Sequence, residues 1–201
     1  MIFFLPVVSW GQVNWNFGTT SGNASPSTNT YSNLTVSDLT QGNNNGTTNL
    51  LTTTSASSGY TGASGQYNAG AAVRTGALNT GAGGSTYFEF TLTPGNSYTV
   101  KLTAISFGAR STSTGPQAYT LRYSIDSYAS DLATGLLTNN STWELKTNTL
   151  LNIVGSVSTS ITFRIYGYNG TGSAVANTAN WRMDDLSLVL DESLLPVELT
   201  S

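Results

Sequence analysis

The stretch TYFEFTLTPGNSYTVKL, residues 86–102, decides the fold. Every second residue from 88 to 92 is apolar, which is the period of a strand with one buried face. Pro94-Gly95-Asn96 predicts a tight turn, because proline presets φ and Gly or Asn tolerates a positive φ. The alternation then resumes and changes phase, which indicates a bulge near Ala104. We therefore expect a β-hairpin over residues 86–107.

Three other stretches, at 13–17, 119–125 and 161–165, alternate in the same way, and residues 181–190 are expected to form the last strand. They are separated by segments rich in Gly, Ser, Thr and Asn, which favour turns and long loops. No stretch of 11 or more residues carries the 3.6-residue period of an amphipathic helix. Many short strands without helices predict an all-β protein, an antiparallel β-sandwich of the jelly-roll kind with long Gly/Ser/Thr/Asn-rich loops.

The composition excludes several classes of chemistry. The 201 residues include no His and no Cys, which removes Ser-His and Cys-His nucleophile pairs, ordinary zinc sites and haem ligation. Charged residues make up 8% of the chain, against about 25% in ordinary soluble domains. With seven Lys and Arg residues and a net charge of −3, the chain has no basic patch for nucleic acid. A hydrophobic content of 38% is sufficient for one packed core.

The chain divides into three expected parts. Residues 1–12 are apolar and too short to span a bilayer, which needs about 20 apolar residues, so we expect a signal-peptide remnant or an apolar terminal strand. Residues 13–191 are expected to form one β-sandwich domain. Residues 192–201 are expected to be a linker toward a C-terminal sorting region that the chain does not contain.

Four segments carry a resemblance to a known kind of protein: FEFTLTP at 88–94, STGPQAYTLRYSID at 113–126, NWRMDDLSL at 180–188 and LPVELTS at 195–201. Together they resemble the exported β-sandwich domains of Gram-negative bacteria that precede a C-terminal sorting signal, often of the type IX secretion kind. The resemblance implies a secreted, extracellular protein of the bacterial cell surface.

The last of the predicted strands carries the adjacent carboxylates Asp184 and Asp185, next to Trp181. This strand resembles the closing strand of carbohydrate-binding jelly rolls, in which an Asp often ligates a structural calcium ion. Calcium prefers about six to eight oxygen ligands, which strand carboxylates and loop carbonyls can supply. The resemblance therefore implies a calcium site at this pair. The alternative is that one carboxylate accepts hydrogen bonds from loop amides.

Aromatic residues on apparently polar strand faces or in loops are candidates for stacking on sugar rings. We select Trp143, Tyr166 and Tyr168 from a wider set that also includes Tyr60, Tyr67 and Tyr128. The alternative is that these side chains cover sheet edges and fill corners of the core.

Catalysis would have to rely on carboxylates. A glycosidase needs two carboxyl groups about 5–10 Å apart. Glu89 and Glu144 are the candidates, and nothing in the sequence pairs them. Neither Lys101 nor Lys146 has a serine three residues before it, so a Ser-Lys dyad has no support. The sequence thus favours a protein that is not an enzyme.

Two functions remain. The first is a subunit of a bacterial surface fibre or adhesin-like layer, in which copies of the chain join head-to-tail by strand addition. The assembly residues would be Ile2, Phe3, Phe4, Val7 and Val8. The alternative is a carbohydrate-binding module of a secreted protein, with glycans as partners and calcium as a structural ion.

Overall fold

The computed structural model describes residues 9–18, 22, 25–65 and 67–194. The structure is built from β-strands and one short 3-10 turn, η1 (Ser124–Asp126). The strands, in chain order, are β1 (Ser9–Trp15), β2 (Thr28–Asn29), β3 (Leu34–Val36), β4 (Thr40–Gly42), β5 (Leu51–Thr52), β6 (Asn68–Ala71), β7 (Tyr87–Pro94), β8 (Tyr98–Ser111), β9 (Ala118–Tyr123), β10 (Ala133–Leu136), β11 (Trp143–Asn148), β12 (Ile153–Gly155), β13 (Ile161–Tyr168) and β14 (Trp181–Leu194). No helix in this part of the chain is long and apolar enough to span a membrane.

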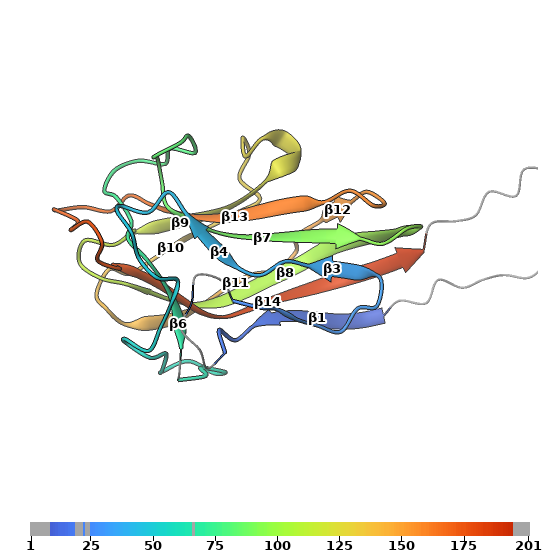
Figure 1. Ribbon diagram of the computed structural model, residues 1–201, viewed down its shortest axis with the longest axis horizontal. Coiled ribbons are helices and arrows are strands. Elements are labelled where there is room, and N and C mark those ends of the chain that lie inside the picture. Colours follow the sequence, from blue (N-terminus) through green and yellow to red (C-terminus); the bar gives the residue numbers. More distant parts are fainter. Residues whose placement is uncertain (1–8, 19–21, 23–24, 66, 195–201) are drawn as a thin grey trace, which may run out of the picture.

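The strands form two antiparallel sheets that pack face to face (Figure 1). The eight-stranded sheet has the order β11-β8-β14-β1-β2, with β12, β6 and β5 attached to it. The six-stranded sheet has the order β10-β9-β13-β7-β3, with β4 also paired to β7. The main strands thus follow the orders 1-14-8-11 and 7-13-9-10, which is the strand exchange of a jelly roll. The predicted fold class is confirmed.

The predicted hairpin over residues 86–107 is wrong. β7 and β8 lie in different sheets, and the turn between them carries the chain across the sandwich. β7 pairs with β13 and β8 pairs with β14. Either arrangement buries one face of each strand, so the alternation of apolar residues is the same in both.

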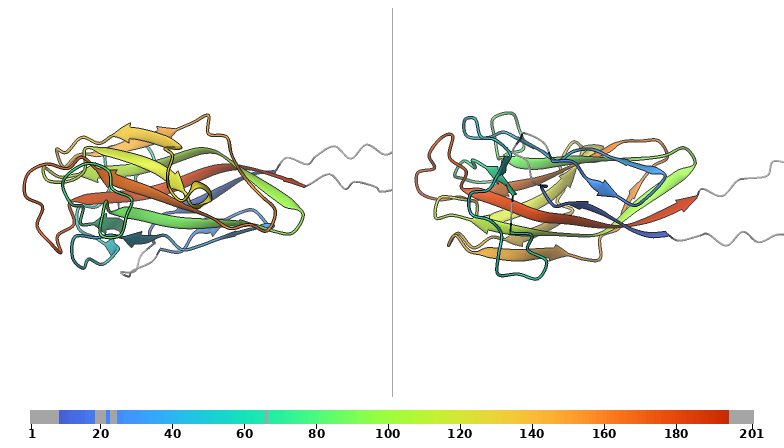
Figure 2. Two further views of the ribbon diagram at one scale, coloured as in Figure 1. Left: turned by 90° about the horizontal axis from the view of Figure 1, so that it is seen from above. Right: turned by 60° about the horizontal axis from the view of Figure 1, so that its bottom comes forward.

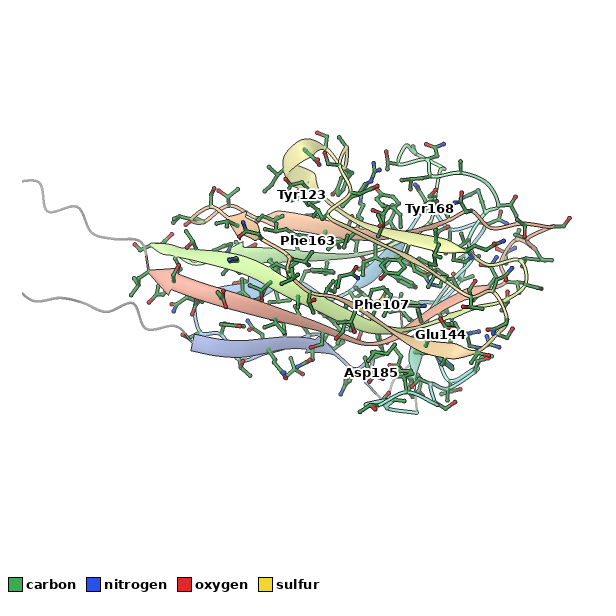
Figure 3. All side chains as sticks on the ribbon, turned by 180° about the vertical axis from the view of Figure 1, so that it is seen from behind. Phe107, Tyr123, Glu144, Phe163, Tyr168 and Asp185 are labelled. Carbon is green, nitrogen blue, oxygen red and sulfur yellow. The ribbon has the colours of Figure 1, made fainter. Side chains whose placement is uncertain are left out.

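The core lies between the sheets and is rich in aromatic rings. Phe90 stacks on Phe163 with ring centroids 5.3 Å apart, and Trp15 lies 5.0 Å from Phe90. Figure 3 shows Phe107 and Phe163 on the two sheets that enclose this core. Fully burying such a side chain contributes about 1.5–3 kcal/mol, so these rings account for much of the stability of the domain.

Two bulges change the faces of the long strands. Between Ala104 and Leu102 the pairing of β8 with β14 skips Thr103, so the predicted bulge near Ala104 is confirmed. A second irregularity lies in β14 between Asp184 and Ser187, where Asp185 has a φ of 49°. It shifts the apolar positions of β14 that face the core from odd to even numbers. Asp184 and Asp185 therefore leave the regular alternation of the strand.

The strand ends bear on the predicted division of the chain. The apolar residues 2–8 proposed for assembly lie outside the described residues, as do residues 195–201 of the sorting linker. Residues 9–12 pair with residues 189–192 of the same chain, so this part of the terminal segment belongs to the chain's own sheet. β1 thus begins before the predicted boundary at 13, and β14 continues to Leu194. Both of these strand ends lie at one end of the sandwich, and the long loops gather at the other (Figure 1).

Candidate functional site

A pocket of about 520 Å³ lies at the loop end of the sandwich. It is formed by the segments on either side of β5 and by β5 itself. The residue before β6, the loop before β14 and the second residue of β14 complete it. Most of its lining side chains carry hydroxyl or amide groups. The lining residues are Thr47, Thr48, Asn49, Leu51, Thr52, Thr53, Tyr67, Asn177, Ala179 and Arg182.

The rim of the pocket is held by hydrogen bonds between two loops. The Thr47 amide donates to Oδ1 of Asn177 (2.6 Å), and the Asn177 amide donates to the carbonyl of Asn45 (2.8 Å). Gly46 has a φ of 89°, and a Cβ there would lie 2.3 Å from the Asn177 side chain. Only glycine satisfies both conditions without displacing Asn177. The sequence Asn45-Gly46-Thr47 therefore fixes the loop against the connection between β13 and β14.

Arg182 forms the charged wall of the pocket and is 7% exposed. It lies opposite Gly70 in the pairing of β14 with β6, and its Nη1 donates to Oδ1 of Asn68 (3.0 Å). Its Nε is buried without a hydrogen-bond partner. Burial, and secondarily the neighbouring Arg110, lower the pKa of Arg182 to about 10, so the guanidinium stays charged at neutral pH. The ion pairs among the described residues do not include it.

The predicted pair Asp184 and Asp185 fastens a loop to the outer face of the eight-stranded sheet. Asp184 is fully buried, and its Oδ1 accepts the Asp185 amide (2.9 Å) while its Oδ2 accepts the Ser64 hydroxyl (3.2 Å). Oδ2 of Asp185 accepts the Tyr60 hydroxyl (2.7 Å) and the Ser64 amide (3.1 Å). Figure 3 shows Asp185 beside the loop segment that these bonds hold. The carboxylates thus act as anchors for residues 60–64.

The burial of Asp184 also perturbs its titration. Desolvation is the main cause that raises the pKa of Asp184 to about 6, and the neighbouring Asp185 carboxylate adds to it. Burial and the hydrogen bond to Asp185 raise the pKa of the Tyr60 hydroxyl. No group of three or more potential metal-ligating side chains (Asp, Glu, His or Cys) occurs among the described residues. The calcium site at Asp184 and Asp185 stays a prediction.

A second hollow, of about 330 Å³, lies beside the anchor on the outer face of the same sheet. Tyr60 and Asp185 form one side, and polar side chains of the strands form the floor. Its lining residues are Asn14, Trp15, Asn16, Tyr60, Thr61, Gly62, Ser106, Leu145, Asp185, Leu186 and Ser187. The Tyr60 side chain lies close against the backbone of β8 at Gly108, where a Cβ would lie 2.1 Å from the Tyr60 hydroxyl.

Trp143 and Tyr166 are buried, so the prediction that their rings are exposed for stacking on a sugar is wrong. Trp143 is 7% exposed, lies under the loop and donates its Nε1 hydrogen to the Ser55 carbonyl (3.0 Å). Tyr166 is on an outer strand face but has no exposed area, because Tyr87 and Tyr128 pack on it. These rings are therefore covered by the protein itself.

Tyr168 is half-buried and lies at the loop end of β13 (Figure 3). The structure does not bring it together with Trp143 or Tyr166 in one pocket lining. Of the wider aromatic set, Tyr67 lines the larger pocket and Tyr60 lines the smaller one. Glycan contact by the selected residues stays a prediction.

The two candidate carboxylates for catalysis are in separate ion pairs on different sheets. Glu89 of β7 pairs with Arg164 (2.6 Å), and Glu144 of β11 pairs with Lys146. The Arg164 guanidinium also lies 4.2 Å and 4.1 Å from the ring centroids of Tyr87 and Tyr128. Each carboxylate is thus held by a basic residue of its own sheet, and the two are not paired with each other.

Sequence reasoning missed Arg182 and the threonines at 47–53. Arg182 occupies an outward position of an alternating strand, where a charged side chain is ordinarily solvated. The one available signal was an arginine beside Trp181 in a chain with few charges. Nothing in the sequence showed that the segment 47–53 would lie across it.

Comparisons with known proteins show low similarity throughout. No protein-family model matches the chain, and no curated protein matches it. Among solved structures, the C-terminal CBM6 of LamC, a marine laminarinase from Zobellia galactanivorans, is 10% identical, with a TM-score of 0.33, over 79% of this chain and 93% of that chain. The cleaved adhesin domain of Lys-gingipain from Porphyromonas gingivalis is 11% identical, with a TM-score of 0.36, over 92% of this chain and 98% of that one.

A third solved structure, the GH26-CBM35 β-(1,4)-mannanase of Podospora anserina, is 13% identical with a TM-score of 0.37. The match covers 83% of this chain and 29% of that chain. At TM-scores below 0.5 these likenesses carry no functional conclusion.

Proposed function

We propose that this protein is a non-enzymatic carbohydrate-binding domain of an exported protein, and that the loop-end pocket is its binding site. The observation that carries the proposal is the lining of this pocket: hydroxyl and amide side chains around one tyrosine ring. Its volume of about 520 Å³ falls within the range of roughly 300–1,000 Å³ that is typical of small-molecule sites.

The chemistry of the lining suits sugars. A sugar hydroxyl both donates and accepts hydrogen bonds, and the Thr and Asn side chains at 47–53 and 177 offer both kinds of partner. The hydrogen bonds across the rim hold the loops in place before a ligand arrives, which lowers the entropy cost of binding.

Tyr67 supplies the apolar surface of the site. Its ring is half-buried, packs partly against the core and borders the pocket. An aromatic ring held in this way presents a flat face with a polar tip, which matches a sugar ring with C–H groups on one face and hydroxyls at its edge.

The test is binding to a panel of neutral and acidic polysaccharides by affinity electrophoresis, followed by calorimetry with oligosaccharides. We expect Tyr67→Ala to weaken binding by about tenfold or more, which corresponds to at least roughly 1.4 kcal/mol. Tyr98→Ala is the matched control, because Tyr98 is also half-buried. It begins β8, whereas the residue of β8 that pairs with Arg182 of the pocket is Arg110, near the other end of the strand. Both variants must retain the wild-type far-UV circular dichroism.

Two results would overturn the proposal. One is the absence of retention on every polysaccharide of the panel. The other is binding that Tyr67→Ala leaves unchanged, which would place the sugar elsewhere, for example in the hollow beside Tyr60.

A further inference from the structure

The loop-end pocket contains a positive charge that nothing in its lining neutralises. Arg182 is the one charged residue among the described residues that line it. The remaining side chains are Thr, Asn, Tyr, Leu and Ala, so no carboxylate faces the guanidinium across the pocket.

The hydrogen bonds of the Arg182 guanidinium leave N–H donors available for a ligand. Nη1 is bonded to Asn68, and Asn68 is held in turn by its Nδ2 hydrogen bond to the Thr54 carbonyl (3.1 Å). Nε is buried and has no partner. Nη1 carries a second hydrogen and Nη2 carries two. Among the described residues these two nitrogens donate only to Asn68, so the other three hydrogens are the donors that remain for a ligand.

The groups packed around Arg182 do not offset its charge. Arg110 of β8 lies directly opposite Arg182 in the sheet and has the same sign. Asp184, two residues further along β14, has one oxygen bonded to the Asp185 amide and the other to Ser64. A buried charge without a partner is costly, and a ligand that supplies the counter-charge recovers part of that cost.

We infer that the pocket selects sugars that carry a negative group, a carboxylate or a sulfate ester, and that Arg182 binds this group. The inference rests on the proposed carbohydrate-binding function and names its ligand class. A charge-assisted hydrogen bond to an anion is about twice as strong as one to a neutral hydroxyl. An acidic sugar is therefore favoured over its neutral counterpart in the same pocket.

The experiment compares polymers that differ only in the charged group. Polygalacturonate and its fully methyl-esterified form test the carboxylate, and a sulfated galactan with its desulfated form tests the sulfate ester. Dissociation constants are measured at low and at high salt for the wild type, Arg182→Met and Arg182→Lys. We expect the wild type to bind one of the acidic polymers about tenfold or more tightly than its neutral counterpart.

Lys101→Met is the control for loss of one positive charge. Lys101 lies nine residues before Arg110 on β8, about 30 Å along the strand from the pocket end. We expect it to keep the preference for the acidic polymer. Arg182→Met should bind both forms of each polymer equally, and Arg182→Lys should keep part of the preference. Thermal unfolding and circular dichroism establish that each variant is folded.

The outcomes separate the two proposals. Equal wild-type affinity for acidic and neutral forms would overturn the inference and leave carbohydrate binding intact. A preference that persists in Arg182→Met would also overturn it, because the charge would then be recognised elsewhere. If no polymer is bound at all, both the binding function and its acidic selectivity are refuted.

Discussion

Replacing Asp184 by asparagine should raise the stability of the protein above about pH 6 and leave it nearly unchanged near pH 4. Asp184 is fully buried, and its pKa is raised from 3.8 to about 6, chiefly by desolvation. The folded state thus binds a proton that the unfolded state releases as the pH rises above 4. Between about pH 4 and pH 6 the contribution of Asp184 to the free energy of unfolding therefore falls. The fall is about 1.4 kcal/mol for each pKa unit, or about 3 kcal/mol in all.

Asparagine keeps the geometry of the anchor while it removes the titration. Its Oδ1 can accept the amide of Asp185, as Asp184 now does. Its Nδ2 can donate to the Ser64 hydroxyl, which keeps that contact with the direction of the hydrogen bond reversed. The difference in stability between Asp184→Asn and the wild type should therefore grow by about 3 kcal/mol between pH 4 and pH 7.

The assay is urea unfolding followed by fluorescence of the four tryptophans, repeated at intervals from about pH 4 to about pH 8. Asp38→Asn, at an exposed side chain, controls for the loss of one carboxylate. A stability difference that is constant with pH would refute the reasoning. So would a variant that is less stable than the wild type above pH 6, because the carboxylate would then be worth more charged than neutral.

Three further variants test the packing of the same structure by urea unfolding. Gly108→Ala places a Cβ at 2.1 Å from the Tyr60 hydroxyl, so Tyr60 must move off Asp185, and we expect a loss of about 1–3 kcal/mol; wild-type stability would contradict this contact. Phe90→Ala removes a ring from the centre of the core, which should cost about 3–5 kcal/mol; a loss below about 1 kcal/mol would mean that the site is less well packed than described. Arg182→Met removes a buried charge that has no ionic partner, so stability should hold or rise; a clear loss would show that the bond to Asn68 outweighs desolvation.

The strands were predictable because each buries one face, and this burial produces an alternation of apolar and polar residues in the sequence. β13 shows this well: Ile161, Phe163 and Ile165 are buried, and Gly167 lies near its end. Alternation does not record which sheet a strand joins. The turn after Pro94 could fold back in one sheet or cross to the other, and the partners that decide this, β13 and β14, lie far along the chain.

The candidate site was less predictable because loops cover outward-facing residues. Trp143 and Asp184 both stand outside the sandwich core, yet the segment 53–65 buries them. Arg182 is buried in the same way beneath the segments next to β5 and β6. A loop without periodicity gives no sign of where it will lie, so the acidic pair was found from its residue type and the arginine was not.

The position of β14 determines how the domain responds to pulling. This strand of 14 residues starts beside the pocket, where Arg182 lines it, and ends at Leu194, about 45 Å further along the strand. Figure 2 shows the strand, in red, running along the sandwich to the end opposite the loops. Tension between a bound ligand and Leu194 acts along the strand, across hydrogen bonds that run perpendicular to it and share the load. Tension between Ser9 and Leu194 instead separates β1 from β14 one pair at a time, beginning at Ser9 and Glu192. The domain should be mechanically strong when pulled by its ligand and weak when pulled by its two ends.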